Sequence, residues 1–406
     1  MTRLHLLPLL LLLLVFTACQ DDDDIATPAL ETPTSYTFER SGVSTVSFSG
    51  QSTRIAMAGE LSSALLDPSN SEETLLNMFR NEGPNGEDVA PFDDAELNAA
   101  TKSIRSKVAA SKDYFAANAT DAAAIKNEFD SWITAQATEV FPQWNQVATE
   151  GQAGQIADGS RTRYVNAQGL EYNQIFAKSL LGGLMLDQAL NNYLSPAVLD
   201  EAQNRSDNES GITATGESYT TMEHKWDEAY GYLFGASADA ANPLVTLGED
   251  DKFLNEYLGK VNEDSDFTGI AGTVFQAFLR GRAAIVAGDY AERDRQADII
   301  QRELSKVVAV RGAFYLARGA DAIETGTTRS SAFHALSEAY GFIYSLQFTR
   351  NPSTGAPYFS RAEVNQMLDQ LSPEQGGLWQ VTPEAIRTIG QDMAQRLDFS
   401  YEAAAN

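Results

Sequence analysis

One twelve-residue motif occurs twice in this chain, and it constrains the fold more than any other feature. The motif runs from His224 to Gly235 and again, without gaps, from His334 to Ser345. Five of its twelve positions are identical (His, Glu, Ala, Tyr and Gly), and the copies lie 110 residues apart. A repeat of this period indicates two copies of one helical unit related by a pseudo-twofold axis. We therefore expect a duplicated helical-bundle repeat.

Helical geometry places the His, the Glu four residues later and the Gly seven residues later on one stripe of the motif. Apolar side chains occupy the opposite face in both copies, at Trp226, Tyr230 and Leu233 and at Leu336, Tyr340 and Ile343. A helix that is apolar everywhere except on one stripe is expected at the centre of a bundle. An ionisable pair in that position is costly unless each member has a partner.

Two explanations satisfy this requirement, and the sequence leaves both open. In the structural one, each His bonds its own Glu or the Glu of the other copy and cross-links the bundle. In the functional one, the two stripes meet at the pseudo-twofold axis and bind a metal ion such as iron or zinc, or a small polar ligand. The four residues of that candidate site are His224, Glu228, His334 and Glu338. A further carboxylate at Asp227 would break the symmetry, because its counterpart is Ser337.

The remainder of the mature chain is predicted to be mainly α. Residues 35–57 alternate apolar and polar side chains between glycines, which predicts a small N-terminal β-hairpin element. Residues 58–406 show helical apolar spacing and form the predicted α-helical domain, with its two repeats at about 165–250 and 290–355. The polar stretch from Thr149 to Ser160 is predicted to be a loop.

The N-terminal residues are typical of an exported lipoprotein. Residues 1–18 have the charged start and short apolar run of a signal peptide, and the run is too short to span a bilayer. The segment Val15 to Cys19 resembles a bacterial lipobox, and Cys19 is the only cysteine. Residues 19–34 are acidic and then rich in Thr and Pro, which predicts a flexible tether. We therefore expect Cys19 to be lipidated and the protein to be membrane-anchored.

The charge of the chain excludes one class of partner. It has 29 Lys and Arg against 56 Asp and Glu, for a formal net charge of −27. Such a chain repels phosphate backbones, and no run of basic residues occurs in the sequence, so nucleic acid is not expected as a partner. One cysteine also excludes an internal disulfide and a Cys-rich zinc site.

Two family resemblances rest on these residues. Tyr36 to Arg40, Val46 to Gln51 and Met222 to Tyr232 resemble the Bacteroidetes lipoprotein family of domain of unknown function 4856 over nearly the whole mature chain. That family has no assigned activity; the resemblance implies an outer-membrane lipoprotein exposed on the cell surface. The duplicated all-α organisation more distantly resembles the imelysin group of iron-regulated envelope proteins. The Gly-x-His-x-x-Glu motif of that group is altered here at Met222 and Asp227.

The sequence therefore predicts a lipid-anchored, non-enzymatic binding protein for a metal or a small polar ligand. Two alternatives remain. One is an envelope peptidase, which only the imelysin resemblance implies. The other is a structural or adhesive surface module in which both histidines are structural.

Overall fold

The computed structural model describes residues 30–326 and 328–406. Helices dominate it, which confirms the mainly α prediction. Their bounds are α1 Ser49–Ala64, α2 Glu72–Arg80, α3 Ala95–Ala99, α4 Ala119–Ala135, α5 Tyr172–Leu180, α6 Pro196–Leu199, α7 Asn204–Glu209, α8 Thr221–Phe234, α9 Leu254–Glu263, α10 Ile270–Ala287, α11 Tyr290–Thr325, α12 Phe333–Ser345, α13 Arg361–Leu371, α14 Pro383–Arg396 and α15 Tyr401–Ala404. Two hairpins pair β1 Glu39–Arg40 with β2 Val43–Ser44 and β3 Gly154–Asp158 with β4 Arg161–Val165.

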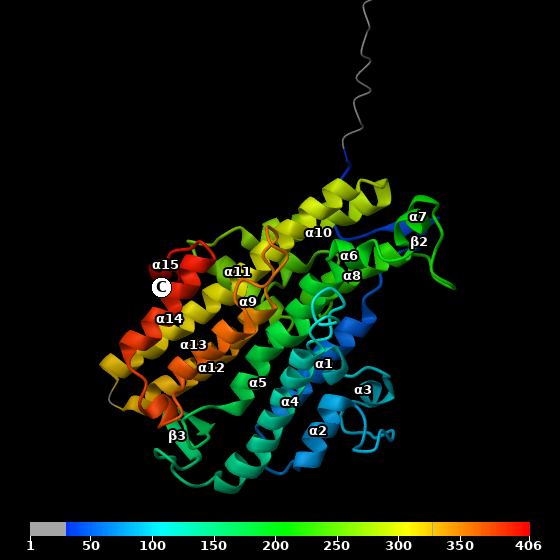
Figure 1. Ribbon diagram of the computed structural model, residues 1–406. Coiled ribbons are helices and arrows are strands. Elements are labelled where there is room, and N and C mark those ends of the chain that lie inside the picture. The colour runs from blue at the N-terminus through cyan, green and yellow to red at the C-terminus, as the bar shows by residue number, and fades with distance from the viewer. Residues whose placement is uncertain (1–29, 327) are drawn as a thin grey trace, which may run out of the picture.

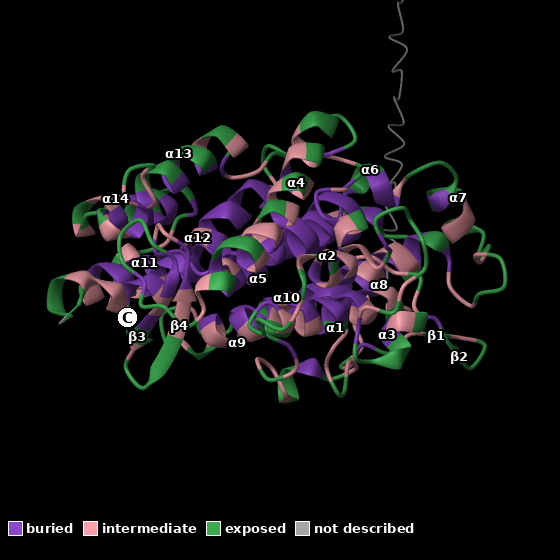
Figure 2. Ribbon diagram, turned by 90° about the horizontal axis from the view of Figure 1, so that it is seen from below, coloured by how far each residue is buried: buried purple, intermediate pink, exposed green. Residues whose placement is uncertain are grey.

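Long buried helices form the centre of the molecule. Helix α5 continues through π-helical turns at Leu181–Leu186 and Ala189–Tyr193, so that residues 172–193 form one rod. The rod lies beside α12, and α12 packs against the 36-residue helix α11. Figure 2 shows these helices in the buried interior, with exposed residues on the outer helices and loops. One continuous hydrophobic core runs through all of them.

The predicted N-terminal β element is much shorter than expected. Only residues 39–44 pair as a hairpin, with Ser41 and Gly42 at positive φ in its turn, as a tight two-residue hairpin requires. The prediction of strands up to residue 57 is wrong, because residues 49–64 form helix α1. The buried positions of α1 include Gln51, Ile55, Ala58 and Leu61, whose spacing of three to four residues is helical.

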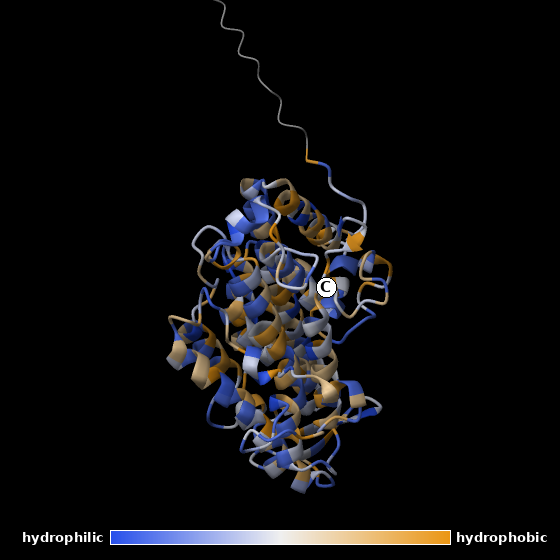
Figure 3. Ribbon diagram, turned by 90° about the vertical axis from the view of Figure 1, so that its right-hand side faces the viewer, coloured by the Kyte–Doolittle hydropathy of each residue, from blue (hydrophilic) through white to orange (hydrophobic). Residues whose placement is uncertain are grey.

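A second hairpin occurs partly where a loop was predicted. Strands β3 and β4 pair in regular antiparallel register from Gly154 with Val165 to Asp158 with Arg161. The inward side chains, Ile156 and Val165, join the core. Polar residues at the other positions hid this alternation in the sequence. Figure 1 places the hairpin at one end of the molecule, whereas the described chain begins at the other end, beside α10. Figure 3 shows the same beginning from the side.

The two motif helices pack in matching ways. Helix α8 packs against α1, and the backbone N–H of Ser47, just before α1, donates to Asp227 on α8 (3.3 Å). Helix α12 packs against α5, and the backbone N–H of Glu171, just before α5, donates to Ser337 (3.0 Å). Asp227 and Ser337 are counterparts in the motif. The packing pairs are therefore α1 with α8 and α5 with α12, and they cross the predicted repeat boundaries.

Helix α10 is the one helix among the described residues that is long and apolar enough to cross a membrane. Two thirds of it is buried, against α11 and α8. A core helix of a folded domain meets the same criteria.

Candidate functional site

The structure separates the two His–Glu stripes. His334 Nδ1 lies 3.0 Å from Glu171 Oε1, at the start of the rod of residues 172–193. Glu228 lies beside the Tyr193 hydroxyl, at the other end of the same rod. At 1.5 Å per residue the rod is about 30 Å long. The four-residue cluster of His224, Glu228, His334 and Glu338 is therefore not formed, and the described residues contain no group of three or more His, Cys, Asp or Glu able to hold a metal ion.

The first stripe is covered by the N-terminal segment, residues 36–51. The Gln51 amide donates to Glu228 Oε1 (2.9 Å). His224 stacks on Tyr219 with ring centroids 4.5 Å apart, and its Nε2 lies 4.0 Å from Glu228. A Cβ added at Gly231 would lie 2.4 Å from the Cβ of Phe48, so the absence of a side chain at Gly231 allows the N-terminal segment to pack closely against α8. The first stripe therefore serves as the packing surface for the N-terminal segment.

A buried ionic network fixes the same segment to α8. Arg282, which is fully buried, donates to Asp227 (3.0 Å) and to Glu223 (3.1 Å). Arg40 of the hairpin pairs with Glu223 (3.0 Å), and the Tyr36 hydroxyl donates to Asp227 (2.8 Å). Burial raises the pKa of Asp227 to about 6, and the Arg282 guanidinium opposes the shift. These groups stabilise one another, and both carboxylate oxygens of Asp227 have hydrogen-bond partners.

The second stripe is part of a chain in which acidic and basic side chains alternate. His334 lies between Glu171, at 3.0 Å from Nδ1, and Glu338, at 3.7 Å from Nε2. Glu338 continues to the Lys178 ammonium at 3.4 Å. Burial lowers the pKa of Lys178 below its ordinary value, and the Glu338 carboxylate opposes that shift. A Cβ at Gly341 would lie 2.4 Å from the Cβ of Lys178, so the motif glycine brings α12 close to α5.

This second stripe borders a pocket of about 500 Å³. Five elements meet there: α1, the β3–β4 hairpin, α5, α9 and α12, with one side chain from α11. Its lining includes five cationic side chains but only two carboxylates, Glu256 and Glu338; the cations are Arg161, Arg163, Lys178, Lys252 and Lys260. Elsewhere in this chain, acidic residues outnumber basic ones about two to one. The fold therefore concentrates positive charge at one place in an acidic molecule. We call this the cationic pocket.

Three of the five cations have partners, and two do not. Arg163 pairs with Asp158 (2.8 Å), Lys178 with Glu338, and Lys260 with Glu256. Arg161 and Lys252 are exposed and make no ion pair within the described residues. Two positive groups at the mouth of the pocket are thus available to a ligand.

The wall of the pocket also holds a buried amide without a partner. Asn173 on α5 is only 5% exposed, and its Oδ1 makes no hydrogen bond within the part of the chain that the structure describes. Because a buried polar atom without a partner is costly, such a group is expected to bond a ligand or water. Tyr257 forms the neighbouring wall, with the Lys178 and Lys260 ammonium groups 5.1 and 5.0 Å from its ring centroid.

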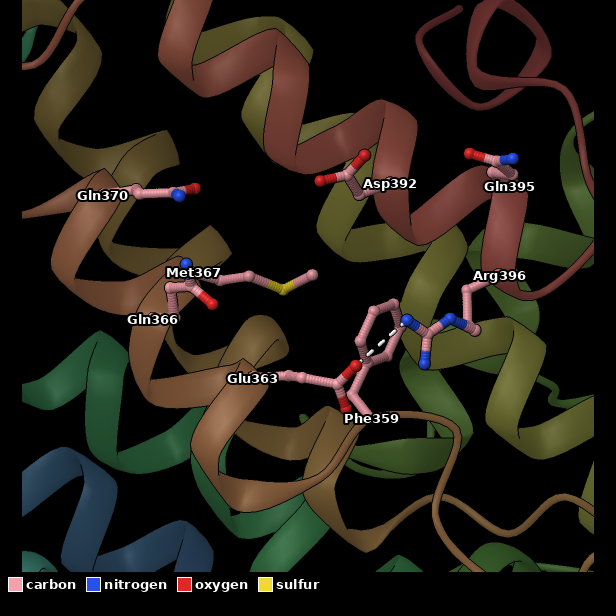
Figure 4. Close-up of a pocket in the computed structure, with 8 residues that line it drawn as sticks. All are labelled: Phe359, Glu363, Gln366, Met367, Gln370, Asp392, Gln395 and Arg396. Carbon is pink, nitrogen blue, oxygen red and sulfur yellow. Dashed lines mark hydrogen bonds and ion pairs between the residues drawn. The ribbon is translucent and has the colours of Figure 1, made fainter.

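A larger groove between α13 and α14 lacks these properties (Figure 4). The Arg396 guanidinium donates to Glu363 across it (3.0 Å), and Arg396 also lies over the Phe359 ring. Glu363 is further engaged in the capping box of α13 with Ser360. The two charged groups that face each other across this groove, Arg396 and Glu363, thus satisfy each other, and no residue of its lining belongs to the repeated motif.

Comparison with protein families matches the sequence model of one family to residues 33–400. The chain belongs to the family of the domain of unknown function DUF4856. The match covers the N-terminal segment, both motif helices and the cationic pocket of this DUF4856 chain. No curated protein and no solved structure matches it.

The sequence prediction found part of this site. His334 and Glu338 lie in the wall of the cationic pocket, whereas His224 and Glu228 lie beside the N-terminal segment. The five cations were missed because they are spread from residue 161 to residue 260 and form no run in the sequence. Cys19 lies outside the described residues.

Proposed function

We propose that this protein is a non-enzymatic binding protein and that its cationic pocket takes a small anionic ligand. The observation that carries the proposal is the gathering of five cations and the unpartnered Asn173 around one pocket of a chain with a net charge of −27. The two cations without ion-pair partners, Arg161 and Lys252, give the pocket a net positive field that raises the local concentration of an anion. Arginine supplies forked donors that suit carboxylate, sulfate and phosphate groups equally well.

The His–Glu pair supports the pocket. Glu338 holds the Lys178 ammonium at the pocket wall, and Glu171 orients His334. Removing the charge of one member leaves its neighbour buried without a partner. His334 and Glu338 are therefore positioning residues, and Arg161, Lys252 and Asn173 are the expected direct contacts.

The test is a titration calorimetry series with inorganic phosphate, sulfate, citrate and glucuronate. We expect one or more of these anions to bind with one-to-one stoichiometry and to bind more weakly as salt rises. The double variant Arg161→Glu with Lys252→Glu should weaken binding at least tenfold. Arg318→Glu is the control for a single charge reversal, because Arg318 is exposed on α11 outside the pocket and its change in charge equals that of either pocket substitution alone.

Two results would overturn the proposal. One is no binding of any of the four anions up to about 10 mM, a concentration that reveals even weak complexes. The other is binding of zinc or iron alone, abolished by His334→Ala, with no response to the anions. The second result would return the site to the metal hypothesis.

We further propose that the protein is attached to the outer membrane through a lipidated Cys19, with residues 19–34 as the tether and the folded domain on the cell surface. The lipobox-like sequence and the single cysteine support this location. Mass spectrometry of the N-terminal peptide from the membrane fraction should show a lipid-modified Cys19. Cys19→Ala should release the protein from that fraction, and continued membrane attachment of this variant would contradict the proposal.

A further inference from the structure

We infer that a second binding site, for a neutral oligosaccharide, lies on the other side of the α5–α12 pair. A groove of about 700 Å³ opens between the end of α4, the start of α5 and α12. On α12, His334 and Glu338 line the cationic pocket, whereas Tyr340 lines this groove. Positions 338 and 340 are about 200° apart around a helix, so the two sites use opposite faces of α12.

The lining of this groove differs in kind from that of the cationic pocket. Three aromatic side chains line it, together with three amides, three hydroxyls and two carboxylates, and no Lys or Arg does so. The aromatic residues are Trp132, Tyr172 and Tyr340, and the amides are Asn127, Asn166 and Gln168. Aromatic rings present flat apolar faces to the C–H faces of sugar rings, and amides and carboxylates supply the donors and acceptors that hydroxyl groups need.

The aromatic residues at the groove are held in place before any ligand arrives. The Trp132 ring packs edge-on against Tyr344 (centroids 5.0 Å apart, 75°) and Phe129 (4.9 Å, 63°). The Tyr172 hydroxyl accepts from the Asn166 amide (3.0 Å) and donates to Glu139 (3.3 Å). Side chains that are already fixed lose little conformational entropy on binding, so a ligand that contacts them binds with a smaller entropic cost.

The backbone beside the groove is also irregular. Helix α4 does not end at residue 135 but continues as a π-helical turn over Gln136–Val140. Thr138 and Glu139 of this turn stand on the rim of the groove. Such π-helical turns are rare and occur frequently at functional sites. The turn places hydroxyl and carboxylate groups beside the aromatic residues at the positions where a chain of sugars would lie.

The charge of the lining selects the class of oligosaccharide. The lining holds two carboxylates, Asp130 and Glu139, and no cation. Asp130 is paired with Arg105 (2.8 Å) and Arg80 (3.5 Å), so Glu139 is the carboxylate that disfavours sulfated and uronic acid sugars. The acidic groups instead accept hydrogen bonds from neutral hydroxyls. The site therefore differs from the cationic pocket in the sign of the charge it accepts, and the failure of either proposal leaves the other standing.

The test uses tryptophan fluorescence, to which the half-buried Trp132 contributes, and four neutral hexasaccharides: cellohexaose, laminarihexaose, maltohexaose and hexa-N-acetylchitohexaose. We expect saturable fluorescence change and calorimetric binding with at least one of them. Trp132→Ala should weaken that binding at least tenfold. Trp144→Ala is the matched control, because Trp144 stacks on Tyr164 (3.4 Å between centroids) outside the groove.

A second variant keeps the test valid if Trp132→Ala does not fold. Asn127 is exposed on the groove rim, so Asn127→Arg should fill the groove without disturbing the core and should also abolish binding. The proposal is overturned if none of the four sugars binds, or if binding survives Asn127→Arg. It is also overturned if a random decapeptide pool binds the groove and the sugars do not.

Discussion

The motif helices α8 and α12 share five identical residues, yet α8 is covered by the N-terminal segment and α12 borders two open sites. In the first copy, Phe48 packs closely against Gly231, and the Glu228 carboxylate accepts a hydrogen bond from the Gln51 amide. In the second copy, α5 packs closely against Gly341, and Glu338 forms an ion pair with Lys178 beside a pocket. The same stripe thus holds the N-terminal segment in one copy and lines a pocket in the other. The neighbouring elements, and not the motif, determine which use a copy has.

The difference at one position, Asp227 against Ser337, is the largest energetic contrast between the copies. Asp227 pairs with the fully buried Arg282, whereas the Ser337 hydroxyl accepts from the Glu171 N–H and donates to the Phe333 carbonyl, with no charged partner. We expect Arg282→Met to lower the free energy of unfolding by about 3–5 kcal/mol, because it leaves two buried carboxylates without their main partner. Urea denaturation measures this loss.

Two further variants provide reference values for the loss of stability expected with Arg282→Met. Arg280→Met on the same helix removes a cation that is 44% exposed and paired with Glu292, so it should change stability by less than about 1 kcal/mol. Lys178→Met removes the single cation bound to Glu338 in the second copy and should cost less than Arg282→Met. An equal or larger loss with Lys178→Met would contradict our account of the first copy as the more tightly held one.

The motif glycines should respond unequally to alanine. A Cβ at Gly341 meets the Lys178 Cβ at 2.4 Å and the Ile175 carbonyl oxygen at 3.0 Å, both on a packed helix. We expect Gly341→Ala to destabilise by about 1–3 kcal/mol through overpacking. At Gly231 the three nearest atoms all belong to the Phe48 and Gln51 side chains and none to the backbone, so the loss with Gly231→Ala should be smaller.

Thermal denaturation of both variants tests this order, and Gly272 supplies the control. No atom lies within 4 Å of a Cβ added at Gly272 in helix α10. Gly272→Ala should therefore stabilise by about 0.5–1 kcal/mol, the helix preference of alanine over glycine. A loss at Gly231 larger than that at Gly341 would show that the first copy is the closer packed of the two.

The last expected effect is the dependence on pH that Asp227 gives the first copy, since its counterpart Ser337 does not titrate in this range. Burial raises the pKa of Asp227 to about 6, above its unfolded value, so the folded state binds the proton more tightly. The stability from this group is therefore present at low pH and is lost as pH rises through about 6. Between pH 5 and pH 7.5 we expect a fall of about 1 kcal/mol in the wild type that Asp227→Asn lacks. Urea titrations at both pH values measure it, and identical pH dependence in the two proteins would contradict the assignment.

Local sequence patterns predicted the helices well and the site only in part. The duplicated motif has the period and apolar face of a buried helix, and α8 and α12 are such helices. The segment 46–57 was misassigned because Val46 and Phe48, and again Ile55 and Met57, are two residues apart, as in a strand, although residues 49–64 are helical.

The site depends on contacts between distant residues, which a single sequence does not encode in any local pattern. Arg161 reaches the cationic pocket from the β3–β4 hairpin, Lys178 from α5 and Lys252 from the loop just before α9. The partner of α12 is likewise α5, about 160 residues earlier, because Gly341 fits against Lys178. Counting charges along the chain showed only an acidic protein, and the three-dimensional arrangement was needed to find the positive region.

The network around Arg282 has a mechanical consequence. Tyr36 is the first buried residue of the described chain, and its ring stacks on Tyr230 at 3.6 Å. A pull on the chain from its N-terminal side would be borne first by this stack and by the Arg40–Glu223 pair, and would pass into α8. The β3–β4 hairpin, with Arg161 and Arg163, lies at the far end of the molecule (Figure 1). The copy that would bear such a pull and the copy that lines the cationic pocket are thus kept apart, so that a pull from the N-terminal side need not distort the pocket.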